Sequence, residues 1–172
     1  VTNYISAYGT LATVSYVAEN SDSADGATYT SRLSDGATPT WSNGVMTVAS
    51  TAASVLRKLT TYSPDGPFSS LQWGLNVTDT FDGGRSLSGK NMNALTTGVC
   101  AGAGCTAIKV GNPLVLRYGR LRLDSASGPE TVKLPVNFLS EYWSGNGFVL
   151  SATDSCTILP LSAITYPNGT LA

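Results

Sequence analysis

Leu-Val-Leu-Arg-Tyr-Gly-Arg-Leu-Arg-Leu, at residues 114–123, is the stretch that decides the fold. Leucine and arginine alternate along its second half, which predicts a β-strand with one apolar face. Residues 131–142 alternate in the same way. Pro135 cannot donate a ladder hydrogen bond, so we expect this second strand at a sheet edge or at a bulge. Residues 142–150 then predict a tight hairpin with glycines in its turn.

Shorter apolar runs upstream show the same pattern and are separated by Gly, Pro, Asn and Asp. They lie at residues 11–17, 27–33, 41–49 and 71–77. Such runs, with no convincing helix between them, predict an all-β chain of about 8–10 strands. Because a lone sheet cannot cover its own apolar face, we expect an antiparallel β-sandwich, either immunoglobulin-like or jelly-roll-like.

The length of 172 residues suits one domain, and we expect a single β-sandwich over residues 1–172. A subdivision would fall near the rigid Ser-Pro-Asp-Gly-Pro turn at residues 63–67. The first residues show neither a start methionine nor a signal region. We therefore expect a fragment of a longer exported chain.

Composition narrows the classes of partner. Only 12% of the residues are charged and the formal net charge is −1, so the chain has no broad electrostatic footprint for nucleic acid or anionic membranes. No apolar run approaches the ~20 residues of a membrane helix, which predicts a protein that does not span a membrane.

Cys100 and Cys105 flank a loop of small residues, and the chain has no histidine and one further cysteine to complete a metal site. We expect a local Cys100–Cys105 disulfide, and hence an oxidising, extracellular or cell-surface location. Cys156 is either a buried free thiol or half of a bridge to a segment outside this chain.

The absence of histidine also bears on catalysis, because neither a Ser-His-Asp nor a Cys-His arrangement can be assembled from these residues alone. Most of the acids lie in turn contexts, where Asp usually bonds its own backbone rather than forming a glycosidase pair. We therefore expect no enzyme activity and no cofactor. Asp79 and Asp82 are candidate ligands for Ca²⁺, although a solvated Asp-Gly turn is the favoured interpretation of this loop.

Three side chains are candidates for binding. Arg120 and Arg122 share the strand face opposite Leu121 and Leu123, and could dock an acidic partner or an anionic glycan. The favoured alternative is cross-strand pairing with acids such as Glu130 or Glu141. Trp143, next to Tyr142 in a strand, is a candidate ring for stacking on a sugar.

The second half of the chain resembles the MshQ-like proteins, a family associated with the mannose-sensitive haemagglutinin type IV pilus. The resemblance is carried in order by Arg117–Leu123, Leu134–Val136, Glu141–Trp143, Gly147–Val149 and Thr153–Thr157. It covers residues 114–157 and continues more weakly over residues 64–82. A doublet usually written Asp-Asp before Ser-Cys-Thr is Thr153-Asp154 here, which weakens any acidic site at that point.

The resemblance implies a long secreted bacterial protein built from several β domains, and it supplies no catalytic residue. We therefore expect a non-catalytic cell-surface domain with an adhesive or structural role beside a type IV pilus. Its partners would be other domains of the same chain, pilus or filament subunits, or surface glycans. Two alternatives stay open: a subunit of an extracellular filament assembled through β-strand pairing, and a carbohydrate-binding module of a secreted protein.

Overall fold

The computed structural model describes residues 12–34, 40–43, 45–47, 54–55, 63–79, 85–129, 131–160 and 162. The chain divides into two compact units, Val1–Arg117 (unit 1) and Tyr118–Ala172 (unit 2). We expected one domain, or a subdivision near residues 63–67, and the division lies elsewhere because the stretch 114–123 is not one strand. It breaks at Arg117 and Tyr118, so its first part pairs within unit 1 and its second part within unit 2.

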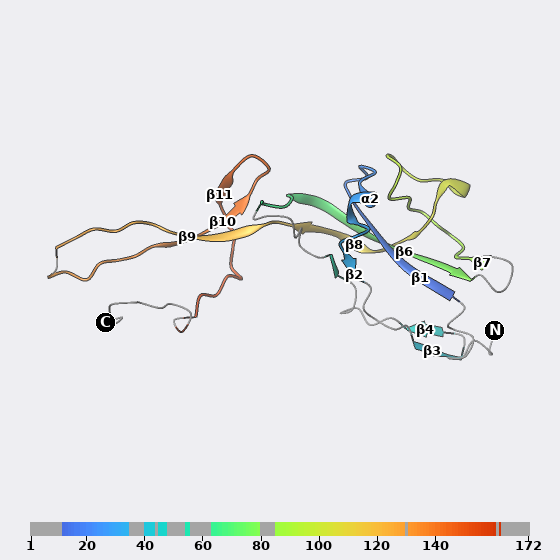
Figure 1. The fold of residues 1–172 in the computed structure, drawn as a ribbon, viewed down its shortest axis with the longest axis horizontal. Helices are drawn as coiled ribbons and strands as arrows, with labels where there is room; N and C mark the ends of the chain where they lie inside the picture. The colour runs from blue at the N-terminus through green and yellow to red at the C-terminus, as the bar shows by residue number, and fades with distance from the viewer. Residues whose placement is uncertain are drawn as a thin grey trace. The chain divides into compact units, whose positions relative to one another are not determined.

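Unit 1 is organised around β6 (Phe68–Asp79), the longest described strand, drawn in green in Figure 1. β1 (Ala12–Asn20) pairs with β6 antiparallel without a break, from Ala12 opposite Asp79 to Asn20 opposite Leu71. β8 (Ile108–Leu116) pairs with β6 on its other side, and β7 (Arg85–Ser86) extends the sheet beside the end of β6. The predicted strand at 71–77 is therefore the centre of a four-stranded antiparallel sheet.

β8 has two features that suit a strand with a free side. Gly111 has a φ of 64°, and Pro113 lacks a backbone donor. The register against β6 also shifts between Phe68 and Leu71 and again between Leu71 and Trp73. Such irregularities discourage a further strand from adding to the sheet.

The remaining elements of unit 1 are short. β2 (Leu33–Ser34) pairs with β5 (Ser54–Val55), and β3 (Thr40–Ser42) pairs with β4 (Val45–Thr47). Residues 27–33 were predicted as a strand, but α2 (Gly26–Tyr29) is a single helical turn. Tertiary packing decides this difference, because Tyr29 is buried in a cluster with Ala18 and Leu71.

Unit 2 contains one described sheet of three antiparallel strands, in the order β11 (Phe148–Leu150), β10 (Phe138–Trp143) and β9 (Gly119–Leu123). The predicted hairpin at 142–150 joins β10 to β11, and Gly145 has a φ of 105° in its turn. Residues 131–137, predicted as the start of a strand, form no strand. The all-β class is confirmed: the described residues contain eleven strands, and the helical elements among them are short, chiefly α2 and the 3₁₀ turn η1 (Gly102–Gly104).

Candidate functional site

Cys100 and Cys105 form a disulfide, with their Cα atoms 5.4 Å apart. The bond closes the tip of a long connection between β7 and β8, and η1 lies inside the closed ring. Val99, immediately before the bridge, is 91% exposed. The disulfide therefore holds a small, uncharged tip in the solvent.

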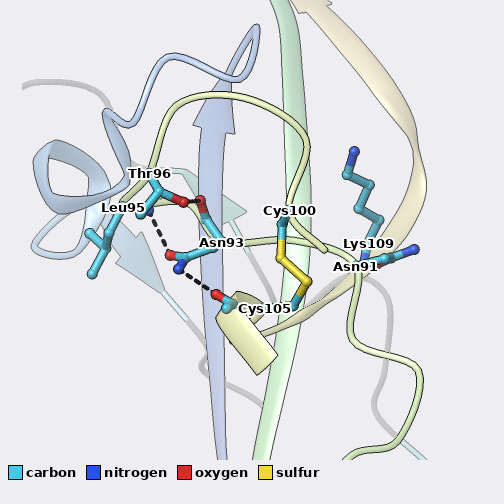
Figure 2. The surroundings of a disulfide bond; sticks show 8 residues. Asn91, Asn93, Leu95, Thr96, Cys100, Cys105 and Lys109 are labelled. Carbon is cyan, nitrogen blue, oxygen red and sulfur yellow. Dashed lines mark hydrogen bonds between the residues drawn. A yellow bond between two sulfur atoms is a disulfide. The ribbon is translucent and has the colours of Figure 1, made fainter. Parts of the chain in front are cut away.

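Asn93 ties the two arms of this connection together, as Figure 2 shows. Its Nδ2 donates to the carbonyl of Gly104 at 2.7 Å, and its Oδ1 accepts from the backbone N–H of Leu95 at 3.1 Å. Asn91 accepts from the backbone N–H of Lys109 at 2.8 Å, so a second asparagine fixes the point where the connection enters β8. The ordered loop therefore depends on side-chain amides as well as on the disulfide.

The base of the connection is packed into unit 1. We call residues 91–107 the cover segment, because Met92 and Ala107 are buried against Val17 on the β1–β6 sheet. Gly74 makes this contact close: a Cβ there would lie 2.6 Å from the Met92 sulfur and 2.8 Å from Val17 Cγ2. The chain thus presents an exposed tip from a buried base.

In unit 2, Arg120 and Arg122 both pair with Glu141, whose side chain is 7% exposed. Arg120 Nε donates to Glu141 Oε2 at 2.8 Å, and Arg122 Nε lies 3.1 Å from Oε1. Arg122 also lies 3.4 Å from Asp124. The two arginines therefore form the cross-strand ion pairs that were the favoured alternative, with Glu141 as their partner. Glu130, the other acid named for this pairing, lies outside the described residues.

The two guanidinium groups are only partly used by these pairs, because the Arg120 and Arg122 side chains are 46% and 50% exposed. Arg120 also stacks on Phe148, with its guanidinium carbon 3.7 Å from the ring centroid. Trp143 packs edge-on against the same ring at 5.4 Å. The three predicted binding residues therefore lie on one face of the β11–β10–β9 sheet.

We call the charged and aromatic side chains here the arginine–aromatic face: Arg120, Arg122, Glu141, Trp143 and Phe148. Leu139 and Leu150 lie on the same side of the sheet by register. Register explains the grouping, since Arg120 is opposite Glu141 and Trp143 is opposite Phe148. Side chains opposite one another in an antiparallel pair lie on the same side of the sheet. Phe148 was not predicted as a site residue, although its place in the hairpin opposite Trp143 was the available signal.

The other face of the same sheet differs from expectation. Leu121 and Leu123 were expected to point into a core, but they are 43% and 58% exposed. Phe138 and Val149 join them on this face by register, at 37% and 39% exposure. In this sheet, therefore, Arg120, Arg122 and Glu141 pack together on one face, while these apolar side chains are exposed on the other.

The predicted calcium residues are only partly within the described structure. Asp79 is the last residue of β6, and Asp82 lies outside the described residues. Across the part of the chain that the structure describes, no group of three or more Cys, Asp or Glu side chains is arranged to hold a metal ion. The Ca²⁺ hypothesis stays a prediction.

Asp154 organises the turn that contains Cys156. Its carboxylate accepts hydrogen bonds from the backbone N–H groups of Cys156 and Thr157, both at 3.0 Å, and from the hydroxyls of Ser140 and Thr157. The hydrogen bonds from Ser140 and Thr157 lower the pKa of Asp154 well below its usual value. Cys156 is free and exposed, so the expected buried thiol is not what the described residues show.

These features define an all-β protein with antiparallel sheets and a short-range disulfide. Residues 1–107 match the family model for the third domain of DUF6701, and residues 117–172 match its fourth domain. The chain belongs to the DUF6701 family. No curated protein and no solved structure matches the chain. The second matched range begins at residue 117, next to the division between the two units at Arg117 and Tyr118.

No helix among the described residues is long and apolar enough to cross a membrane.

Proposed function

We propose that this chain is a non-catalytic part of an exported, MshQ-like bacterial surface protein, with an adhesive or structural role associated with a type IV pilus. The observation that carries the proposal is the arginine–aromatic face of unit 2. Two half-exposed guanidinium groups are held by one carboxylate beside packed aromatic rings. Side chains fixed before a ligand arrives lose less conformational entropy on binding.

The chemistry of this face suits an acidic or glycan ligand. A guanidinium offers several N–H donors in one plane, and Glu141 occupies only part of the set on each arginine. Trp143 and Phe148 add apolar surface of the kind on which sugar rings stack. Export is supported by the Cys100–Cys105 disulfide, because such bonds persist mainly in oxidising compartments.

The test is binding of the purified chain to bacterial cells, isolated pili and immobilised glycans. R120K/R122K keeps both positive charges near Glu141 but removes the planar donor fork. We expect it to lose at least about tenfold in affinity, which is ~1.4 kcal/mol, while the circular dichroism spectrum stays unchanged. K133S is the matched control, since Lys133 is exposed and lies outside the sheet.

Salt gives a second readout, because exposed charges are screened over about 8–10 Å at physiological ionic strength. Binding through the arginines should weaken as salt rises, and the R120K/R122K variant should differ from the parent at every salt concentration. Binding equal to that of the parent would refute the role of this face.

One observation favours the filament alternative. The exposed side chains of Leu121, Leu123, Phe138 and Val149 form an apolar sheet face of a kind that marks association sites. If copies assemble through it, the purified chain should sediment as particles larger than a monomer in a concentration-dependent way. L123K should then return it to the monomer, whereas R120K/R122K should not.

A further inference from the structure

Glu19 is a buried carboxylate in unit 1 that the proposed binding face does not use. It lies on β1 opposite Gln72 of β6, and the residue is 3% exposed. Its Oε2 has no hydrogen-bond partner within the described part of the chain. When Glu19 is ionised, this oxygen has lost its water without gaining a donor, which is costly.

The cover segment lies over the same face of the sheet. Glu19 and Val17 are two residues apart on β1, so their side chains point to the same side. Met92 and Ala107 pack against Val17, and farther along Ala94 meets Gly26, whose N–H donates to the Ala94 carbonyl at 2.8 Å. The cover segment therefore packs against residues on both sides of Glu19 in the sequence, Val17 before it and Gly26 after it.

The charged groups that face Glu19 come from two places. Asp22 and Asp25 lie in the loop after β1, and Lys109 lies on β8. Burial raises the pKa of Glu19, Asp22 raises it further, Lys109 opposes the change, and Asp25 adds a smaller increase. The cover segment contributes no titratable group, since its two cysteines form the disulfide, and Gln72 is neutral.

We propose that Glu19 makes the docking of the cover segment depend on pH. When Glu19 is neutral, the segment can stay closed over it at little electrostatic cost. When Glu19 ionises, the carboxylate gains hydration only if the segment lifts, so the open form becomes more populated. The ionisation of Glu19 would therefore set how often the cover segment, with its disulfide-closed tip, is docked on the sheet. This effect is independent of the arginine–aromatic face.

Hydrogen exchange of backbone amides tests the proposal in the intact chain. The amides of Gly26 and Lys109 donate to the segment from outside it, at the Ala94 carbonyl and the Asn91 side chain, and report its opening. After correction for intrinsic exchange, their opening equilibrium should rise about tenfold per pH unit between the open-state and closed-state pKa values of Glu19. Outside that window it should be flat, and amides of β10 in unit 2 serve as the internal control.

Three variants make the outcome specific. E19Q should abolish the slope, and K109Q should move the window to higher pH because it removes the charge that favours ionised Glu19. D22N should move the window to lower pH, so the two neighbour variants shift in opposite directions. A slope unchanged in E19Q would overturn the proposal. If E19Q fails to fold, equal windows in K109Q, D22N and the parent would overturn it as well.

Discussion

Arg120 and Glu141 face each other across β9 and β10, with Nε donating to Oε2 at 2.8 Å while the same guanidinium lies over the Phe148 ring. Arg122 takes the other carboxylate oxygen of Glu141. One nearly buried acid therefore fixes the direction of two arginines. Arg120 and Arg122 therefore do not behave as independent surface charges.

The first prediction follows from this sharing. Replacing either arginine with serine should lower the free energy of unfolding by less than about 1 kcal/mol, because the other arginine still pairs with Glu141. R120S/R122S should cost more than the sum of the two, about 1–3 kcal/mol, since it leaves a buried carboxylate unpaired. Urea unfolding measures these differences.

The control is the same pair of changes in an E141Q background, where no buried charge is left alone. There the arginine replacements should be nearly additive and small. A non-additive cost of equal size in the E141Q background would show that the Glu141 carboxylate is not the cause.

The second prediction concerns the disulfide. Reduction should add the mass of two hydrogens to the intact chain, and peptide mapping should place the bond between Cys100 and Cys105. C100S/C105S should lower the free energy of unfolding by no more than about 2 kcal/mol, because the closed ring is short. Free thiols at both positions in protein from an oxidising compartment would contradict the assignment.

The third prediction uses the close contact at Gly74. G74A should destabilise unit 1 by about 1–3 kcal/mol, because its new methyl group would overlap the Met92 sulfur and Val17. G104A is the matched control, since nothing lies within 4 Å of a Cβ at Gly104. Equal unfolding midpoints for the two variants would mean that the cover segment is not packed as described.

The fourth prediction concerns acid. The pKa of Asp154 is lowered in the folded chain. Its stabilisation of the turn is therefore fully present above the usual pKa of 3.8, and it is lost as the pH falls through the folded-state pKa. Protection of the Cys156 and Thr157 amides should therefore begin to fall below about pH 4 and should decrease progressively as the pH is lowered further. D154A should lose it at neutral pH, and S140A should show an intermediate loss. Protection that does not depend on Asp154 would remove it as the organiser of the turn.

The extent of sequence prediction differs between elements. β6 and the β10–β11 hairpin were predicted because alternation and turn glycines are local signals. The helical turn at Gly26–Tyr29 was predicted as a strand, because its burial against Ala18 and Leu71 involves residues remote in sequence. The break at Arg117 and Tyr118 was missed, although the apolar positions change phase there, from Leu116 and Tyr118 to Leu121 and Leu123.

The candidate site shows the same limit. Period-two spacing predicts that Arg120 and Arg122 share a face, and the structure agrees. Spacing alone cannot indicate that both converge on one carboxylate, because that depends on the register between β9 and β10. The bonds of Asp154 to the Cys156 and Thr157 amides are local, but its bond to Ser140, 14 residues away, could not be predicted from the sequence.

The register of the unit 1 sheet has a mechanical consequence for a chain under tension. β1 begins opposite Asp79 at one end of β6, whereas β8 ends opposite Phe68 at the other. A pull on Ala12 and Leu116 therefore acts along the strands, in shear. Ladder hydrogen bonds lie across the strands, so this pull loads them together instead of unzipping them one at a time. Force spectroscopy with handles at these two residues should record a high rupture force, and handles at Asn20 and Leu71 a low one.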